Sequence, residues 1–215
     1  VAAHLQALQR LALEHGMAGQ LAQHALDGLE RAEGLAAADA GVGLGLVHHA
    51  RLLALGGEQQ PRLQGAVWLW GCLCAEGLGH AELYEGTLDA VQYQRILALN
   101  LVKSAHTFWP KGLWFYQQDN ASPHTAGTSR AWFHNHGITV LDFPPYSGDL
   151  SPAENLWSDL KRRVYAHQPQ TMQELEDWIG KEWAATELDF CKRTCLSLPY
   201  RLQLVRANKG HKISY

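Results

Sequence analysis

Trp114-Phe115-Tyr116-Gln117-Gln118-Asp119-Asn120-Ala121-Ser122-Pro123-His124-Thr125 is the stretch of sequence that decides the fold. It opens with three aromatic residues, which are typical of a short buried strand. Asp119 stands where that strand ends, the position at which α/β sheets present groups to ligands. Taken alone, the pair Asp119-Asn120 also fits ordinary turn chemistry, so the residue type does not by itself establish a site.

A second acidic residue, Glu154, is separated from Asp119 by 34 residues and stands directly after a loop rich in proline, at the expected start of a helix. Two carboxylates brought together in this way can hold hard divalent cations such as Mg²⁺, which prefer oxygen ligands. The alternative is structural. Ser151-Pro152-Ala153-Glu154 has the form of a capping box, in which Glu154 would bond back to the backbone amide of Ser151.

Around these two acids the hydrophobic pattern predicts an α/β order with a mixed sheet. We expect a strand hairpin at residues 66–73 and 81–84, followed by a helix that is capped by Thr87 and reaches residue 102. A strand at 114–116, a helix at 125–135 and a strand at 138–143 come next, and helices continue to about residue 205.

The first part of the chain differs in character. Residues 1–64 are rich in Ala, Leu, Gly and His and show no sustained period apart from a helical spacing at residues 5–15. We therefore interpret 1–64 as a degenerate or irregular N-terminal segment and 65–215 as the folded catalytic-type domain. The pair His48-His49 has no acidic neighbour, so exposure or disorder is its default interpretation.

Composition is that of an ordinary globular protein, with 47% hydrophobic and 18% charged residues. The sequence contains no run of about 20 apolar residues of the kind that spans a membrane. The net charge of -3 counts against DNA binding, although residues 108–215 hold 12 Lys/Arg against 11 Asp/Glu and are less acidic than the first half. The four cysteines lack zinc-knuckle spacing, and we expect free thiols.

The two acidic segments resemble those of a known family. Residues 117–125 are similar to the segment Q-x-D-N-x-x-x-H-T of mariner-superfamily transposases, and residues 144–157 resemble P-x-x-S-P-D-L-N-P-I-E-N-L-W of the same family. The 34-residue spacing is that of the D-D-34-E branch. The similarity continues in Leu160-Lys161-Arg162-Arg163, in Val67–Gly71 and in the tail Ala207–Tyr215, so it covers about residues 65–215.

This resemblance implies an RNase H-like fold, with a mixed five-stranded sheet flanked by helices. It implies cut-and-paste DNA transposition, that is, metal-dependent DNA cleavage and strand transfer with two Mg²⁺ (or Mn²⁺) ions, in the nucleus, with no membrane partner and with a homodimer as one arrangement. Asp119 and Glu154 would be the second and third acidic metal ligands. The supporting positions would be Asn120, His124, Asn155 and Trp157. The positions that contact DNA would be Lys161, Arg162 and Arg163.

The sequence departs from the family pattern at the first acidic residue. Family members carry it on the opening strand; here Asp27 has a fitting distance of 92 residues to Asp119 but sits in a helical context, and it is the candidate. The paired helix-turn-helix modules of the family are also not evident, so we expect DNA binding without sequence specificity. Two functions stay open: a metal-dependent transposase, or a transposon-derived DNA-binding or interaction protein without a complete acidic triad.

Overall fold

A mixed sheet forms the centre of the molecule. The computed structural model describes residues 44–55, 67–110, 113–141 and 147–214. Its five strands lie in the order β3-β2-β1-β4-β5. The first three pair antiparallel, and β4 and β5 run parallel to β1; the bounds are β1 (Leu44–Leu55), β2 (Val67–Cys74), β3 (Gly77–Tyr84), β4 (Leu113–Gln117) and β5 (Thr139–Leu141).

The central strand, β1, lies inside the segment that the sequence predicted to be irregular. Its backbone pairs with β2 on one side and β4 on the other, with His48 opposite both Leu73 and Gln117. The prediction of an irregular 1–64 is therefore wrong for residues 44–55, and His48-His49 belong to a strand. The run contains one glycine and a single β-branched residue, so local preference for a strand is weak and pairing on both edges decides the conformation.

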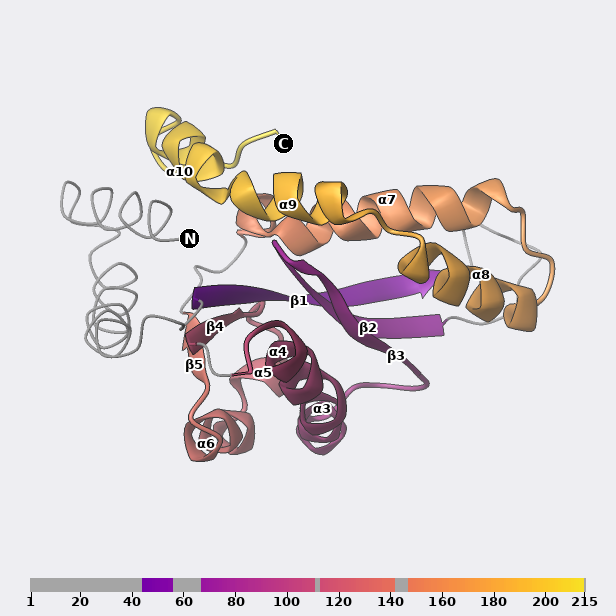
Figure 1. Cartoon of the computed structure of the whole chain (residues 1–215), viewed down its shortest axis with the longest axis horizontal. Helices are drawn as coiled ribbons and strands as arrows, with labels where there is room; N and C mark the ends of the chain where they lie inside the picture. Colours follow the sequence, from indigo (N-terminus) through magenta and orange to yellow (C-terminus); the bar gives the residue numbers. More distant parts are fainter. Residues whose placement is uncertain (1–43, 56–66, 111–112, 142–146, 215) are drawn as a thin grey trace.

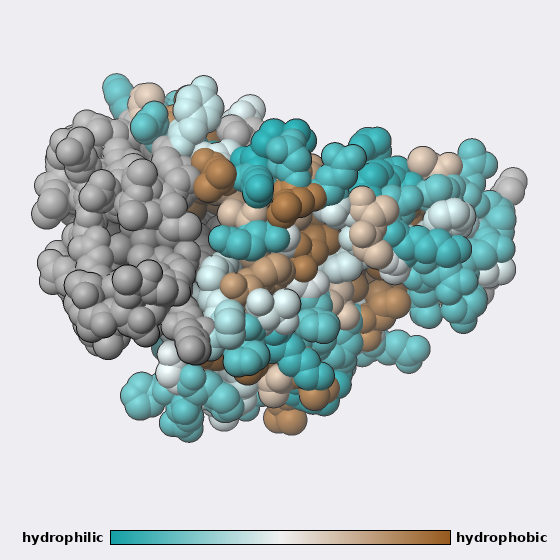
Figure 2. All heavy atoms as spheres, viewed as in Figure 1, coloured by the Kyte–Doolittle hydropathy of each residue, from teal (hydrophilic) through white to brown (hydrophobic). Residues whose placement is uncertain are grey.

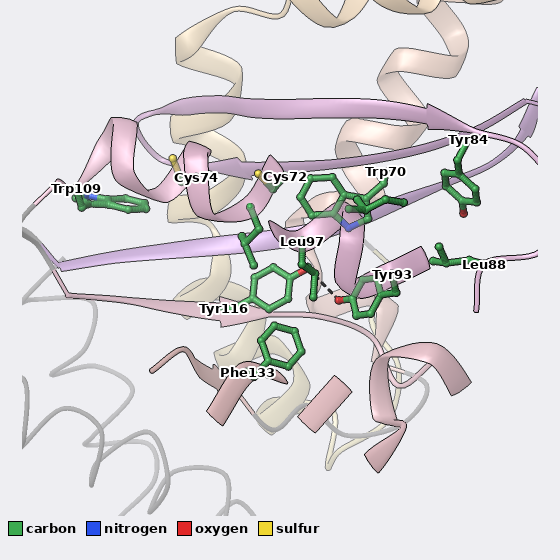
Figure 3. Packing of buried hydrophobic residues seen from close by; sticks show 12 residues of the cluster. Trp70, Cys72, Cys74, Tyr84, Leu88, Tyr93, Leu97, Trp109, Tyr116 and Phe133 are labelled. Atoms are coloured by element: carbon green, nitrogen blue, oxygen red, sulfur yellow. Dashed lines mark hydrogen bonds between the residues drawn. The ribbon is translucent and has the colours of Figure 1, made fainter. Parts of the chain in front are cut away.

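One face of the sheet is covered by α3 (Ala90–Ile96), the π-helical turn η1 (Leu97–Leu101), α4 (Val102–Phe108) and α6 (Gly127–Asn135). Figure 3 shows the aromatic core beneath them, where Trp70 of β2, Tyr116 of β4 and Phe133 of α6 pack around Tyr93. The expected Thr87 cap is wrong. Asp89 caps α3 by accepting the Gln92 amide at 2.7 Å, so the helix begins later.

The opposite face carries α7 (Pro152–Ala166), α8 (Met172–Ala184) and α9 (Leu188–Leu196), and α10 (Leu198–Ala207) continues beyond them (Figure 1). Leu69 and Leu73 of β2 pack here, whereas Trp70 points to the other face. This alternation is the two-residue period of a strand buried on both sides. Trp183 of α8 lies so close to Gly71 that a Cβ there would meet its ring at 2.4 Å.

The surface agrees with this layered arrangement. Figure 2 shows hydrophilic residues over the outward faces of the C-terminal helices and hydrophobic residues between the two helical layers. Within the described ranges, every helix is too short or too polar to cross a membrane. All four cysteines are free and buried, as the sequence predicted; burial raises the pKa of the Cys72 thiol to about 12, so it stays protonated.

Candidate active site

Asp119 is held by its own loop. It follows β4 and precedes α5 (Ser122–Thr125). Its Oδ1 accepts the Ala121 amide at 3.0 Å and lies 2.5 Å from Nδ1 of His124. The imidazole of His124 is fully buried, whereas the Asp119 side chain is 63% exposed. A buried ring therefore fixes the direction of a carboxylate that faces solvent, as the outer partners of metal ligands do.

Tyr93 and Gln118, to which the sequence analysis assigned no role, support His124. The ring of Tyr93, on α3, lies against the imidazole with centroids 4.3 Å apart. Its hydroxyl donates to Oε1 of Gln118 at 2.5 Å and contacts the Tyr116 hydroxyl at 3.2 Å, the pair joined by the dashed line in Figure 3. Gln118 in turn donates to the His124 carbonyl at 3.2 Å. Burial raises the pKa of Tyr93 well above its ordinary value, so this hydroxyl remains a donor.

Glu154 stands in the first turn of α7, and it does not serve as a cap. The Ser151 amide donates to the Gly148 carbonyl at 2.9 Å, and the Ser151 side chain makes no capping bond. The capping-box interpretation is therefore wrong, because a 3-10 turn, η2 (Gly148–Leu150), already satisfies the amide that Glu154 would have bonded. The glutamate is exposed, and its carboxylate is available for other contacts.

The fold brings the two acids into one electrostatic site. Partial burial and the negative charge of Asp119 both raise the pKa of Glu154, while the charges of Lys161 and Lys212 lower it. Carboxylates whose charges raise each other's pKa are typical of sites that bind a cation. Their role as metal ligands stays a prediction from the sequence, supported by this juxtaposition.

The residue after Glu154 anchors the site to the C-terminal helices. Asn155 Oδ1 accepts Nη2 of Arg201 at 2.5 Å, and Nη1 of the same guanidinium donates to the Asp149 carbonyl at 3.1 Å. The Arg201 side chain, on α10, is almost wholly buried. Asn155 was predicted as a supporting residue, but its partner was not, since 46 residues separate the two.

The remaining motif positions divide into surface and core. Asn120 is exposed beside Asp119. Trp157 is buried in the core, with its ring 6.0 Å from that of Trp183, so it packs rather than binds.

The basic run of α7 separates into three environments. Lys161 lies close enough to Glu154 to lower the pKa of that carboxyl. Arg162 is exposed and donates to Asp159 at 2.6 Å. Arg163 is directed inward, where it bonds Asp159, Thr186 and both the carbonyl and the carboxylate of Glu182. The Arg163 guanidinium thus joins α7 to α8, and its predicted DNA contact stays a prediction.

The structure does not locate the first acid of the predicted triad among the described residues. Asp27 lies outside the described residues. The strand beside Asp119, β1, contains no Asp or Glu in its sequence. Within the described part of the chain, no group of three His, Cys, Asp or Glu side chains could hold a metal ion. Asp119 and Glu154 offer the oxygen ligands that Mg²⁺ and Mn²⁺ prefer, but they fit only part of a two-ion site.

The comparisons with known proteins give the family. The family model described as DDE superfamily endonuclease matches residues 55–176. The chain belongs to this family. Over 151 residues it is 29% identical to the Tc1 transposase of Caenorhabditis elegans, covering 70% of this chain and 55% of that protein. It is 31% identical to the Tc3 transposase of the same organism over 153 residues, covering 70% and 46%. The chain thus spans about half the length of the curated relatives it matches.

Solved structures agree on the fold. The chain is similar to the catalytic domain of the Mos1 mariner transposase, with a TM-score of 0.69 at 21% identity, covering 79% of this chain and 84% of that one. A structure of the Mos1 catalytic domain with Raltegravir and Mg gives a TM-score of 0.70 at 19% identity, covering 87% and 94%. The predicted resemblance to mariner-superfamily transposases is confirmed at the level of the DDE superfamily and its Tc1/mariner homologues, and the predicted mixed α/β fold is confirmed.

Proposed function

We propose that this chain is the catalytic domain of a DDE transposase of the D-D-34-E branch, with an RNase H-like five-stranded sheet, and that it performs metal-dependent DNA cleavage and strand transfer. The observation that carries the proposal is that the negative charge of Asp119, at the end of β4, acts on the carboxyl of Glu154, at the start of α7. Family membership and the similarity to transposase catalytic domains support it.

The residues of the chain would divide the work as follows. Asp119 and Glu154 would hold the divalent cations, Mg²⁺ or Mn²⁺, which activate a water or a DNA hydroxyl and stabilise the leaving oxygen. His124 keeps the Asp119 carboxylate pointing toward solvent. Arg201 and Asn155 keep the first turn of α7 in place.

DNA is the proposed substrate, and the nucleus is the proposed location. Solved structures of the Mos1 transposase include a paired-end complex, a pre-cleavage transpososome and a strand-transfer complex, and these assemblies are those of that protein. For this chain we propose binding to transposon ends and target DNA, without sequence specificity from the described domain alone. A homodimer is part of the proposal, since cut-and-paste transposition joins two ends.

The non-catalytic alternative rests on β1. This strand pairs parallel with β4 and contributes no acidic residue, so a third ligand would have to come from outside the described residues, with Asp27 as the candidate. A site with only two carboxylates would bind metal weakly and would not support phosphoryl transfer. The comparisons favour the transposase.

A nicking assay decides between the two. We expect the full chain with Mn²⁺ to convert supercoiled plasmid to the open circle, and the Asp119→Ala and Glu154→Ala variants to lose this activity. Asp177→Ala, which removes an exposed acid on α8, is the matched control and should be unaffected. Equal activity in Asp119→Ala would remove Asp119 from the mechanism. Loss of nicking in Asp27→Asn would identify the third ligand.

A further inference from the structure

The end of the chain returns to the acidic site. The family match ends at residue 176, before α9, α10 and the tail that follows them. After α10, Lys209 and Gly210 adopt positive φ angles of 53° and 84°, which reverse the chain direction. The side-chain nitrogen Nδ2 of Asn208 then donates to the backbone carbonyls of His211 and Lys212 at 3.3 and 3.0 Å. The tail that follows α10 (Figure 1), residues 208–214, is thus a hydrogen-bonded turn that reverses the chain direction.

Asp149 fastens this tail beside Glu154. Its Oδ2 accepts the Ile213 amide at 2.9 Å, and its carbonyl accepts the Arg201 guanidinium. Asp149 belongs to η2, which leads directly into α7, and a Cβ on its neighbour Gly148 would lie 3.7 Å from Cγ of Glu154. Lys212 is therefore held next to the residues that surround the glutamate.

Lys161 reaches the same place from α7. It lies seven residues after Glu154, about two helical turns, so the two side chains share one face of the helix. The positive charges of Lys161 and Lys212 both act on the Glu154 carboxyl. Within the described residues, neither lysine forms an ion pair with Glu154. The ion pairs found there are made by arginine and histidine side chains with other acids. Both positive charges thus act on the Glu154 carboxyl without an ion pair to it.

We propose that Lys212, carried by the C-terminal tail, binds a DNA backbone phosphate beside the acid pair together with Lys161. This inference rests on the proposed function, because it takes DNA as the ligand. A phosphodiester that approaches two carboxylates needs positive charge on its flank, and lysine supplies it as a flexible point charge. The tail is then a part of the active site, supplied from the far end of the chain.

The test measures binding of a fluorescein-labelled 20-base-pair duplex of arbitrary sequence to the full chain by anisotropy, over a range of salt. We expect K212Q to weaken binding about tenfold at 0.1 M salt and to lower the salt slope by about 1, as the loss of one phosphate contact does. K212R should bind like the unchanged protein. The matched control is K209N, which removes one positive charge from the same turn and keeps a residue suited to positive φ.

The proposal fails if K209N and K212Q weaken binding equally, since general charge would then explain the loss. It also fails if K212Q binds normally while the unchanged chain nicks plasmid DNA, and the proposed function then stands without it. No binding by the unchanged chain overturns both. A specific defect of K212Q, with nicking that survives Asp119→Ala, supports the phosphate contact and overturns the catalytic role of the acids. Thermal unfolding should be unchanged in K212Q, because the side chain is exposed.

Discussion

The two carboxylates of the site are held in opposite ways. Asp119 takes its contacts from Ala121 and His124, two and five residues further along the same loop. Glu154 follows a loop in which Asp149 is fixed by Arg201 and Ile213, 52 and 64 residues away. Local sequence therefore builds one half of the site, while the other half depends on the C-terminal helices and tail. A change far along the chain should disturb Glu154 and leave Asp119 in place.

The largest effect that would sharpen this contrast is expected from Arg201→Met. The substitution keeps an apolar stem of similar length but removes the donors to Ser197 Oγ, the Asp149 carbonyl and Asn155 Oδ1. Buried acceptors left without donors destabilise the fold, and we expect a loss of about 3 kcal/mol in the free energy of unfolding in urea. Manganese-dependent nicking should fall as well, because the start of α7 loses its anchor.

Arg193→Met is the control for Arg201→Met. Arg193 is an exposed arginine of α9 whose partner, Asp189, is also exposed. Removing such a surface pair should change stability by less than about 1 kcal/mol. Similar losses in the two variants would show that Arg201 is not an anchor.

The local half is tested by His124, where two replacements differ in the position of their amide. Asparagine places its amide nitrogen near that of Nδ1 and can still donate to Asp119, whereas glutamine places it further out. Both lose the buried ring packed on Tyr93 and should cost about 2 kcal/mol. Metal affinity, measured by Mn²⁺ titration of nicking, should fall about 10-fold or more in His124→Gln and less in His124→Asn.

His136→Gln provides the comparison for the His124 variants. This histidine is exposed and stacks on Trp132. We expect no change in Mn²⁺ dependence. If His124→Asn and His124→Gln behaved alike, the bond to Asp119 would not be what orients the carboxylate.

The same contrast explains how much could be predicted from the sequence. Asp119 was identified from its place at the end of a strand, and His124 from the resemblance of residues 117–125 to the family segment; both signals are local in the sequence. The hairpin and the strand before Asp119 were likewise predicted, since a two-residue or helical period is a local signal. The proline-rich loop and the proline at the first helical position placed Glu154 at the start of a helix, which α7 confirms.

What escaped prediction depends on partners distant in sequence. β1 has weak local preference and is fixed by pairing with β2 and β4. Nothing near Arg201 indicates that its side chain is buried against Asn155. Tyr93 lies within the helix predicted up to residue 102, and nothing near it in sequence indicates that its hydroxyl and ring support the Asp119 loop. Residue patterns report periodicity, and they do not report which side chains meet across a fold.

A smaller effect is expected from Asp149→Ala, which cuts the link between the tail and η2. Loss of the acceptor for the Ile213 amide should cost about 1 kcal/mol of stability. Removing a negative charge would by itself strengthen DNA binding, but we expect weaker binding because Lys212 is released. Once the tail is free, adding Lys212→Gln should have little further effect, a non-additivity that a double-mutant cycle measures. Stronger binding by Asp149→Ala would contradict the anchored tail.

The smallest effect is expected at Ser151, where sequence and structure disagree most directly. Its side chain makes no capping bond, so Ser151→Ala should change the free energy of unfolding by well under about 0.5 kcal/mol. Thr171 provides the matched case. Its hydroxyl accepts the Glu174 amide at 3.1 Å, while the Glu174 carboxylate accepts the Gln170 amide at 2.7 Å, so Thr171→Ala should cost about 1 kcal/mol. Both helices begin with a hydroxyl residue followed three positions later by glutamate, yet only α8 uses that glutamate for its own start. Equal losses at the two positions would mean that Glu154 is drawn into a cap in solution, and the acid pair would then lose the partner that makes it a site.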